Sequence, residues 1–437
     1  MCYAVPGRVI ECKEHTVLID YFGEKRSAYV EPGEVRVGDF VYAQGGLVVE
    51  TIPEGEAAVI LESWREAFAR LKERDRRLAL AGAPLVPENR SIAAILKKAE
   101  GGGTLSEEEC GALLACDERG GIDALCRTAN RVRQKVHGNS CCVHGIIEFS
   151  NFCGNDCGYC GIRGENRDVE RYRMTVDEIV NVACDAVTDL GFRALVLQSG
   201  EDEYYTAAML GEIVGRIRAR CGVLLILSVG NREPGVYDRL YEAGARGVLM
   251  RFETSNPDLY KNIHGGSSYD TRIAALELLK DRGYLIATGS LIGLPGQTVP
   301  DILKDITLTG SFAPEMYSFG PLVPHPDTPL AGADRVNIDA VLKVLAVTRI
   351  LNPGGSILVT SAVESLFGRQ GVERGLMAGG NSLMINVTPP EYRERYTIYP
   401  GRVTGGETIG MEIADKVALL SALGRAPTDI GIGGSSG

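Results

Sequence analysis

From Gly145 onward, short apolar runs alternate with segments in which apolar residues recur every three or four positions. The short runs predict buried strands, and the three-to-four spacing, as in 175–190, 269–282 and 338–351, predicts amphipathic helices. Eight strand–helix units with short connections favour an α/β fold, a parallel (β/α)8 barrel, over the alternative of a doubly wound open sheet. The predicted strands cover residues 145–150, 194–199, 223–229, 247–253, 286–292, 316–323, 356–361 and 382–387.

The first 52 residues have a different pattern, with short β-type runs separated by Gly and Pro, as at Phe22-Gly23 and Pro32-Gly33. This pattern predicts a small β-barrel. From Glu54 to about Leu80 the periodicity becomes helical, with an apolar face. The apolar residues of that face are Ile60, Trp64, Phe68 and Leu71.

These patterns divide the chain into five parts. The segment after the first helix is rich in Pro and Gly, which is typical of a linker, and the last residues are Gly- and Ser-rich, which is typical of a flexible tail. The expected parts are a β-barrel with its C-terminal helix (1–80), a linker (81–89), a helical lead-in (90–140), the (β/α)8 barrel (141–425) and a flexible tail (426–437).

Charge and composition exclude several classes of function. The net charge of −11 argues against binding to nucleic acid. No apolar run approaches the roughly 20 residues of a membrane helix, and the N-terminus lacks the layout of a signal peptide. Twelve cysteines in a chain that is not exported indicate reduced thiols, and so a cytoplasmic protein.

Cys153, Cys157 and Cys160 follow the first predicted strand of the large barrel with the spacing CxxxCxxC. Three thiolates can hold three irons of a [4Fe–4S] cluster and leave the fourth iron open. In this spacing the expected ligand of the open iron is S-adenosylmethionine (SAM), bound through its amine and carboxylate. A structural zinc site is the alternative, but it requires four ligands, and no second cysteine pair follows. The motif lies at the carboxyl end of a strand, where (β/α)8 barrels place their chemistry.

The stretch from Ile147 to Cys160, followed by Arg171-Tyr-Arg-Met-Thr175, resembles the radical SAM superfamily, and in particular its HydE branch of [FeFe]-hydrogenase maturases. The resemblance covers about 90–425 and implies that SAM is cleaved reductively to methionine and a 5′-deoxyadenosyl radical. Further matching stretches are Gln198–Asp202, Arg251–Thr254, Gly293–Thr298 and Gly320–Leu330.

The resemblance also implies a set of residues that bind SAM. Glu201 is suited to accept from the methionine ammonium, and Gly200 lets a ligand approach the backbone. Arg251 and Glu253 alternate along a predicted strand, so both are expected to face the barrel interior, where charges need a partner or a ligand. A purely structural ion pair is the alternative. The expected SAM-binding residues are Tyr159, Gln198, Ser199, Glu201, Arg251, Glu253, Arg272 and Leu294.

The HydE resemblance implies an organometallic substrate, a cysteine-bound iron–carbonyl–cyanide species, with the radical acting on its sulfur. An anionic substrate requires hydrogen-bond donors at the cavity floor. For the two methionines of the set, filling of the core is the alternative role. The expected substrate residues are Ser228, Met316, Thr360, Ser361, Met384, Tyr396 and Tyr399.

The N-terminal stretches Met1–Val9, Asp20–Gly23 and Val37–Val41 resemble the HypC/HupF chaperones of [NiFe]-hydrogenase maturation. In that family the cysteine after the initiator methionine helps to carry an iron–cyanide–carbonyl unit, and Cys2 matches it. Gln44 stands where a histidine is usual. We hypothesise that Cys2 delivers or receives such a unit at the barrel, because tethering raises the effective concentration of the handover. A plain docking domain is the alternative.

The sequence therefore predicts a radical SAM maturase, with hydrogenase maturation proteins as its expected partners. One alternative is an enzyme like methylornithine synthase or biotin synthase that acts on a small organic substrate. Another is a metallocofactor scaffold or chaperone without catalytic activity. No cysteine follows Cys221, which weighs against a second cluster of the biotin synthase kind.

Overall fold

The computed structural model describes residues 4–30, 35–81, 87–265, 267–402, 408–429 and 431. Its centre is an eight-stranded parallel sheet that curls into a nearly closed barrel, with the order β14-β12-β10-β9-β8-β7-β6-β15. A bridge between Leu358 and Ser382 brings the two edge strands together. The strands are β6 (Cys142–Ser150), β7 (Ala194–Ser199), β8 (Leu224–Ser228), β9 (Gly247–Leu249), β10 (Leu285–Thr288), β12 (Met316–Tyr317), β14 (Ser356–Ile357) and β15 (Ser382–Asn386). The predicted (β/α)8 barrel is thus confirmed.

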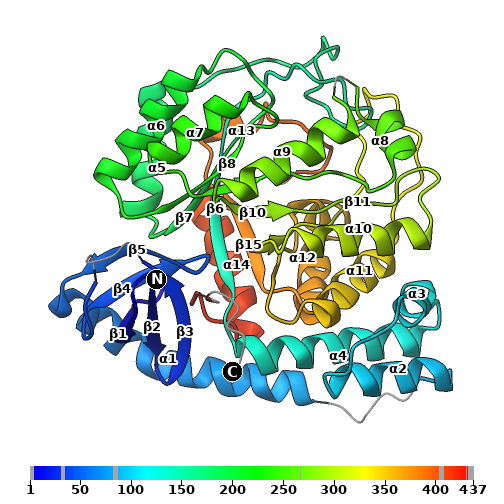
Figure 1. Cartoon of the computed structure of the whole chain (residues 1–437), viewed down its shortest axis with the longest axis horizontal. Coiled ribbons are helices and arrows are strands. Elements are labelled where there is room, and N and C mark those ends of the chain that lie inside the picture. Colours follow the sequence, from blue (N-terminus) through cyan, green and yellow to red (C-terminus); the bar gives the residue numbers. More distant parts are fainter. Residues whose placement is uncertain are drawn as a thin grey trace.

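Helices surround this barrel, as Figure 1 shows. Several begin at a Ser or Thr cap; Thr175 and Thr298, for example, each form a capping box with the acidic residue three positions later. The surrounding helices are α5 (Val176–Thr188), α6 (Ala207–Arg220), α7 (Pro234–Glu242), α8 (Pro257–Ile263), α9 (Tyr269–Asp281), α10 (Val299–Ser311), α11 (Ile338–Leu351), α12 (Ser361–Met377), α13 (Pro390–Arg393) and α14 (Ile409–Ala422). The lead-in helices are α2 (Arg90–Glu100), α3 (Glu107–Ala115) and α4 (Arg119–His137).

The N-terminal strands form a second, smaller closed barrel with the order β1-β2-β3-β5-β4. Its interior is apolar because alternate residues such as Val17 and Ile19 face inward. The turn at Phe22-Gly23 has positive φ at both residues. The elements are β1 (Gly7–Cys12), β2 (Thr16–Tyr21), β3 (Glu24–Tyr29), β4 (Phe40–Gln44), β5 (Leu47–Ile52) and the long helix α1 (Glu54–Leu80). The predicted small β-barrel is confirmed.

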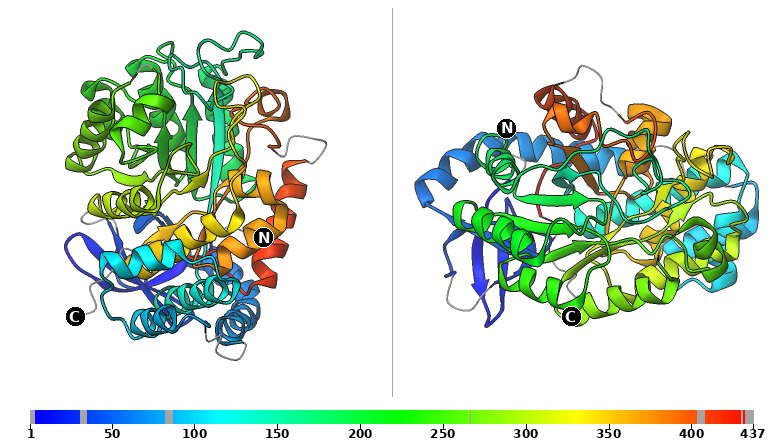
Figure 2. Two further views of the ribbon diagram at one scale, coloured as in Figure 1. Left: turned by 90° about the vertical axis from the view of Figure 1, so that its right-hand side faces the viewer. Right: turned by 90° about the horizontal axis from the view of Figure 1, so that it is seen from above.

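The small barrel lies against the end of the large barrel at which the strands begin, as Figures 1 and 2 show. Leu47 packs against a buried apolar cluster of the large barrel that includes Leu224 and Ile226. Arg193 forms an ion pair with Glu50 at 3.4 Å. The two barrels therefore meet through an apolar contact with a charged rim.

Several predicted strands are shorter than expected at their carboxyl ends. The stretch 247–253 is a strand only to Leu249, and 356–361 only to Ile357. The stretches 286–292 and 316–323 each continue, after a break, into the short paired strands β11 (Leu291–Ile292) and β13 (Gly320–Pro321). Polar side chains that line a cavity follow the shortened strands β9, β12 and β14; they include Arg251, Ser318 and Thr360.

The C-terminal segment also differs from expectation. Ala426, Thr428 and Asp429, expected in the flexible tail, are buried. Ala426 pairs with Ser140, and the Ser140 and Thr428 hydroxyls are 2.7 Å apart. Residues 82–86 of the expected linker and 432–437 of the tail lie outside the described residues.

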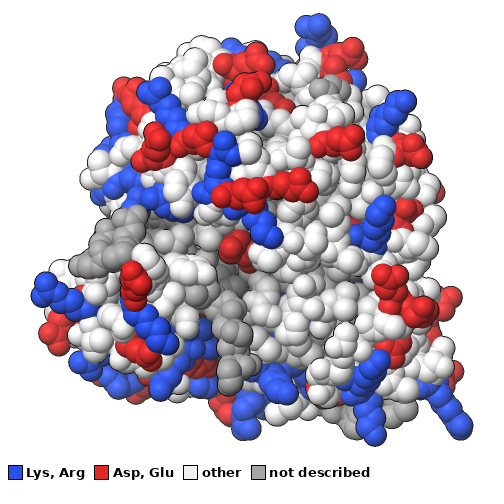
Figure 3. All heavy atoms as spheres, viewed as in Figure 1, with Lys and Arg blue, Asp and Glu red and all other residues white. Residues whose placement is uncertain are grey.

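Acidic and basic side chains are interspersed over the face that Figure 3 shows. None of the helices in the described part of the chain is both long and apolar enough to cross a bilayer.

Candidate active site

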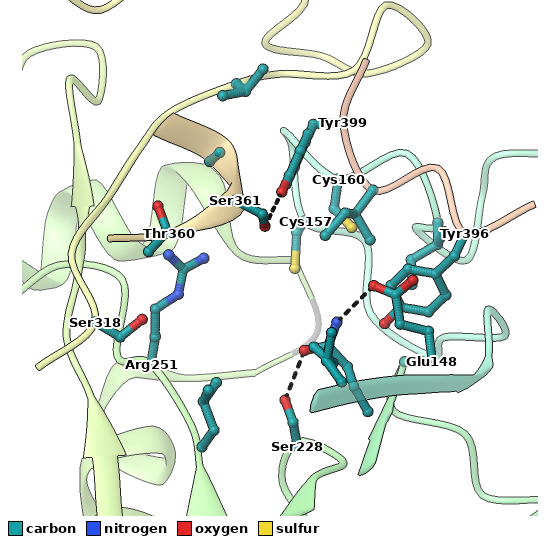
Figure 4. Close-up of a pocket in the computed structure, with 18 of the residues that line it drawn as sticks. Glu148, Cys157, Cys160, Ser228, Arg251, Ser318, Thr360, Ser361, Tyr396 and Tyr399 are labelled. Atoms are coloured by element: carbon teal, nitrogen blue, oxygen red, sulfur yellow. Dashed lines mark hydrogen bonds between the residues drawn. The ribbon is translucent and has the colours of Figure 1, made fainter. Parts of the chain in front are cut away.

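The loop after β6 brings Cys153, Cys157 and Cys160 to one cavity of about 330 Å³ at the carboxyl end of the large barrel (Figure 4). Backbone hydrogen bonds fix this loop to its neighbours. Gly154 N donates to Glu201 O at 2.9 Å, and Gly158 N donates to Ile263 O at 2.8 Å. The cysteine loop is therefore held by the loop that follows β7 and by the last residue of α8.

The surroundings of the three thiols fit a multi-iron cluster. Burial, then Cys153, raises the pKa of Cys160 to about 12, and burial also raises the pKa of Cys153 and Cys157. Cluster ligands must be thiolates, so the positive charge of bound iron would offset this cost. Among the described residues no three His, Cys, Asp or Glu side chains are placed to hold a single metal ion.

Arg272, on α9, reaches the cavity and contacts the loop after β7. Its Nη2 donates to Glu201 Oε1 at 3.0 Å and to His264 Nε2 at 3.2 Å. Burial, with Arg272 beside it, lowers the pKa of His264 to about 4, so that imidazole is neutral. Gly230 has φ +70°, and a Cβ there would lie 2.0 Å from Glu201 Cγ. Glycine at that position leaves room for the Glu201 side chain.

Arg251 and Glu253 both line the cavity, although they follow β9 instead of belonging to it. Their side chains form an ion pair at 3.4 Å. Glu253 has φ +66°, a left-handed conformation that is unusual for a non-glycine residue and common at functional sites. In Figure 4 the Arg251 guanidinium points into the cavity beside Thr360.

The other residues expected at SAM differ in their placement. Tyr159, Gln198 and Ser199 line the cavity, and burial raises the pKa of Tyr159 well above its ordinary value. Leu294 instead is buried in the core and does not line the cavity. Its backbone N–H donates to Gln297 Oε1 at 3.2 Å within a tight turn that carries its side chain away.

Six of the seven expected substrate residues line this cavity. Ser228 Oγ donates to Gln198 Oε1 at 3.3 Å, and the Ser361 and Tyr399 hydroxyls are 2.7 Å apart. Thr360 Oγ1 is buried and has no hydrogen-bond partner among the described residues. Met384 and Tyr396 complete this group.

Met316 was expected with them, but it lines a different cavity at the opposite end of the barrel. It is the first residue of β12, so its inward side chain lies below the level of the active site. Cys2 lies outside the described residues.

A buried polar network in the cavity was missed from the sequence. Glu148, on β6, is fully buried and accepts from Arg402 Nη2 at 2.5 Å and from Asn386 Nδ2 at 2.8 Å. Gln198 Nε2 also approaches it, at 3.5 Å. A carboxylate in the middle of an apolar strand was the available signal, because such a group needs a buried partner.

Three family models match the chain. Residues 147–309 match the radical SAM superfamily, residues 1–64 match the HupF/HypC family, and residues 318–419 match the Biotin and Thiamin Synthesis associated domain.

Among curated relatives, the chain is 39% identical over 314 residues to the [FeFe] hydrogenase maturase subunit HydE of Thermotoga maritima, a match that covers 72% of this chain and 89% of that protein. It is 28% identical to 3-methylornithine synthase of Methanosarcina barkeri, over 66% of this chain and 81% of that protein.

Two solved structures share the fold. Methylornithine synthase (PylB) superposes with a TM-score of 0.68 and 26% identity, over 77% of this chain and 98% of the other. The maturase HydG of Carboxydothermus hydrogenoformans superposes with a TM-score of 0.67 and 22% identity, over 83% and 84%. The HydG likeness bears on the fold alone.

The superfamily uses a [4Fe–4S] cluster and SAM, and the cavity offers residues that fit both. The cysteine loop, the fold and the match to HydE agree. The chain belongs to the HydE family of radical SAM enzymes and carries a HupF/HypC-family domain at its N-terminus.

Proposed function

We propose that this enzyme cleaves SAM reductively and acts on a cysteine-bound iron–carbonyl–cyanide species in maturation of the active site of a hydrogenase. One observation carries the proposal: a HydE-family barrel and a HupF/HypC-family domain occur in one chain. The name of HydE refers to hydrogenase maturation, and the resemblance of the N-terminal domain to the HypC/HupF chaperones implies the same process. When bound, the cluster and SAM supply a 5′-deoxyadenosyl radical.

In this proposal Cys153, Cys157 and Cys160 hold the cluster. Arg272 orients Glu201, whose carboxylate receives the SAM ammonium, and Arg251 is available to the SAM carboxylate because its planar fork suits such a group. Gln198, Ser199, Tyr159 and Glu253 complete the wall around SAM. Buried walls exclude water from the radical.

One side of the cavity is suited to an anionic iron complex. Thr360 Oγ1 has an unused hydrogen-bond capacity, and Ser361 and Tyr399 present two further hydroxyls. Cyanide and carboxylate groups accept hydrogen bonds from such donors. Ser228, Met384 and Tyr396 form the remaining walls against the substrate.

Cys2 has a separate role in the proposal, as the residue that carries an iron unit on the N-terminal domain. The Cys2→Ser variant should lower the iron and cyanide content of the purified protein and slow turnover. If both the iron and cyanide content and the turnover are unchanged, the N-terminal domain does not carry iron, and docking is its remaining role.

The main test is anaerobic turnover of the reconstituted protein with a cysteine-ligated iron dicarbonyl cyanide complex, followed by electron paramagnetic resonance. We expect 5′-deoxyadenosine and a signal from a substrate-derived species in the wild type. Cys157→Ala should lose both, while Cys116→Ala, outside the cavity, should retain them. Cleavage of SAM that persists in Cys157→Ala contradicts the mechanism. Cleavage that the iron complex leaves unaffected contradicts the substrate, and favours a small organic one.

A further inference from the structure

A second cavity, the lower cavity, lies at the end of the large barrel where the strands begin. Its volume is about 510 Å³, within the roughly 300–1,000 Å³ range of small-molecule sites. Both barrels line it: Tyr29 and Gly45 come from the small barrel, and His144, Met316 and Ser356 come from the large one. The site therefore depends on the presence of the N-terminal domain.

The lower cavity contains a hydrogen-bond donor that the described part of the chain leaves unused. Ser356 is 5% exposed, and its hydroxyl has no hydrogen-bond partner among the described residues. Removing a hydroxyl from water without giving it a partner is unfavourable. A buried serine aimed at a cavity thus indicates a ligand with an acceptor group.

The other polar groups of the lower cavity are soft or neutral. Two of the lining residues contact Ser382 Oγ, which is not itself part of the lining: His144 Nδ1 lies 3.4 Å from it and Met316 Sδ lies 3.6 Å from it. Burial lowers the pKa of His144 to about 4, so its ring is uncharged at neutral pH. The described lining includes no Lys or Arg, and its carboxylate, Glu315, accepts from Ile286 N at 2.5 Å. Such a surface disfavours the concentrated negative charge of a phosphate. It suits a compact complex of a soft metal whose charge is spread over small acceptor ligands.

The lower cavity is separated from the active site by side chains alone. Along β6, His144 faces the lower cavity and Glu148 faces the upper one. Met384 lines the upper cavity and belongs to the same apolar cluster as Met316, which lines the lower one. Methionine side chains are unbranched and adapt their shape readily. Rotation of side chains in this layer would join the two spaces without any backbone movement.

We propose that the lower cavity is a second ligand site, which holds the thiol-bound iron–carbonyl–cyanide complex intact between the small barrel and the active site. The choice of ligand rests on the proposed function. No bond forms or breaks at this site, because its role is to hold the complex. Ser356 donates to a cyanide or carbonyl group, and the complex enters the barrel from the end opposite the cysteine loop.

The test counts the iron complexes bound per chain. Full-length protein with its cluster reconstituted and SAM bound is equilibrated anaerobically with the cysteine complex of iron dicarbonyl cyanide, then gel-filtered. The infrared bands of CO and CN give the number bound. Ser356→Phe fills the lower cavity and should bind one complex fewer than the wild type. Ser311→Phe, the same change at an exposed position, should bind as many as the wild type.

Abortive cleavage of SAM without the complex should be equal in Ser356→Phe and the wild type, which shows that the upper site is intact. If the Ser356→Phe protein does not retain its iron–sulfur cluster, the Ala287→Leu variant is used in its place, because Ala287, on β10, lines the same cavity. If the folded variant and the wild type bind the same number of iron complexes per chain, the proposal of a second site is wrong. The proposed function is tested separately, by turnover of the iron complex in the wild type. If the wild type does not turn the complex over, the proposed function is wrong, but the expected difference in the number of complexes bound is unchanged.

Discussion

Arg272 Nη2 lies 3.0 Å from Glu201 Oε1, so α9 and the loop after β7 meet in an ion pair inside the active-site cavity. Burial by itself would lower the pKa of Arg272, but Glu201, Tyr260 and Glu253 together more than offset this and the pKa is raised. The guanidinium uses Nη2 for both Glu201 and His264. One nitrogen of Arg272 therefore links Glu201 to His264.

Arg272→Lys should weaken SAM binding while leaving the iron and sulfide content unchanged. Lysine keeps the charge but loses the planar fork. Loss of a charge-assisted hydrogen bond costs about 1.5–3 kcal/mol, which corresponds to a rise of roughly ten- to a hundredfold in the KM for SAM. Arg282→Lys, which changes the partly exposed pair with Asp238, is the matched control. Equal KM values in the two variants would contradict a positioning role.

Arg402→Met should destabilise the protein because it leaves the buried Glu148 carboxylate without its cation. Breaking a buried ion pair from one side typically costs about 3–5 kcal/mol. Denaturant unfolding under anaerobic conditions measures the change. The double variant Glu148→Gln with Arg402→Met should recover most of the loss. Arg395→Met, whose partner Glu170 is exposed, should cost under about 1 kcal/mol.

The sequence was sufficient to predict both barrels, because buried strands appear in it as short apolar runs. It overestimated the lengths of β9 and β14, because the polar residues that follow them face the cavity and leave the ladder. The Glu148–Arg402 pair was not predictable from spacing, since the partners are 254 positions apart. The CxxxCxxC motif was sufficient to locate the cluster loop. Which of the two cavities an inward-facing strand residue lines depends on its height in the barrel, as Met316 illustrates.

Asp305 should make stability fall as pH rises from about 4 to about 6. Burial raises its pKa to about 6, against roughly 3.9 in the unfolded chain. The folded state thus binds more protons than the unfolded state in this window, so the free energy of unfolding decreases with pH. Asp305→Asn should remove this contribution. The effect is measured as the difference between the variant and the wild type in the free energy of unfolding, from unfolding curves recorded between about pH 4.5 and pH 7.

The Asp305 comparison needs the difference between variants because His144, with a lowered pKa of about 4, acts in the opposite direction. Asp281→Asn, an exposed position, is the control. Parallel pH profiles for Asp305→Asn and the wild type would contradict the assignment.

Arg193→Ala should loosen the small barrel from the large one. Arg193 pairs with Glu50 at 3.4 Å, and its guanidinium carbon lies 4.5 Å from the centre of the Tyr42 ring. Together these contacts are worth about 1–2 kcal/mol. Limited proteolysis should release the N-terminal domain faster than in Arg216→Ala, whose ion pairs lie on the barrel helices. Equal rates would mean that the Arg193 contacts do not limit release, and that other contacts, such as the buried Arg133–Asp75 pair, hold the domain.

The two cavities share the strands of one barrel. Each strand residue advances about 3.3 Å, so the length of β6 between the ends of the barrel is set by backbone hydrogen bonds. Because the small barrel is docked on this rigid frame, the distance between the cavities is independent of any linker. Passage of a ligand between them would then be limited by rotation of interior side chains. Its rate should follow the internal friction of the barrel and be insensitive to the viscosity of the solution.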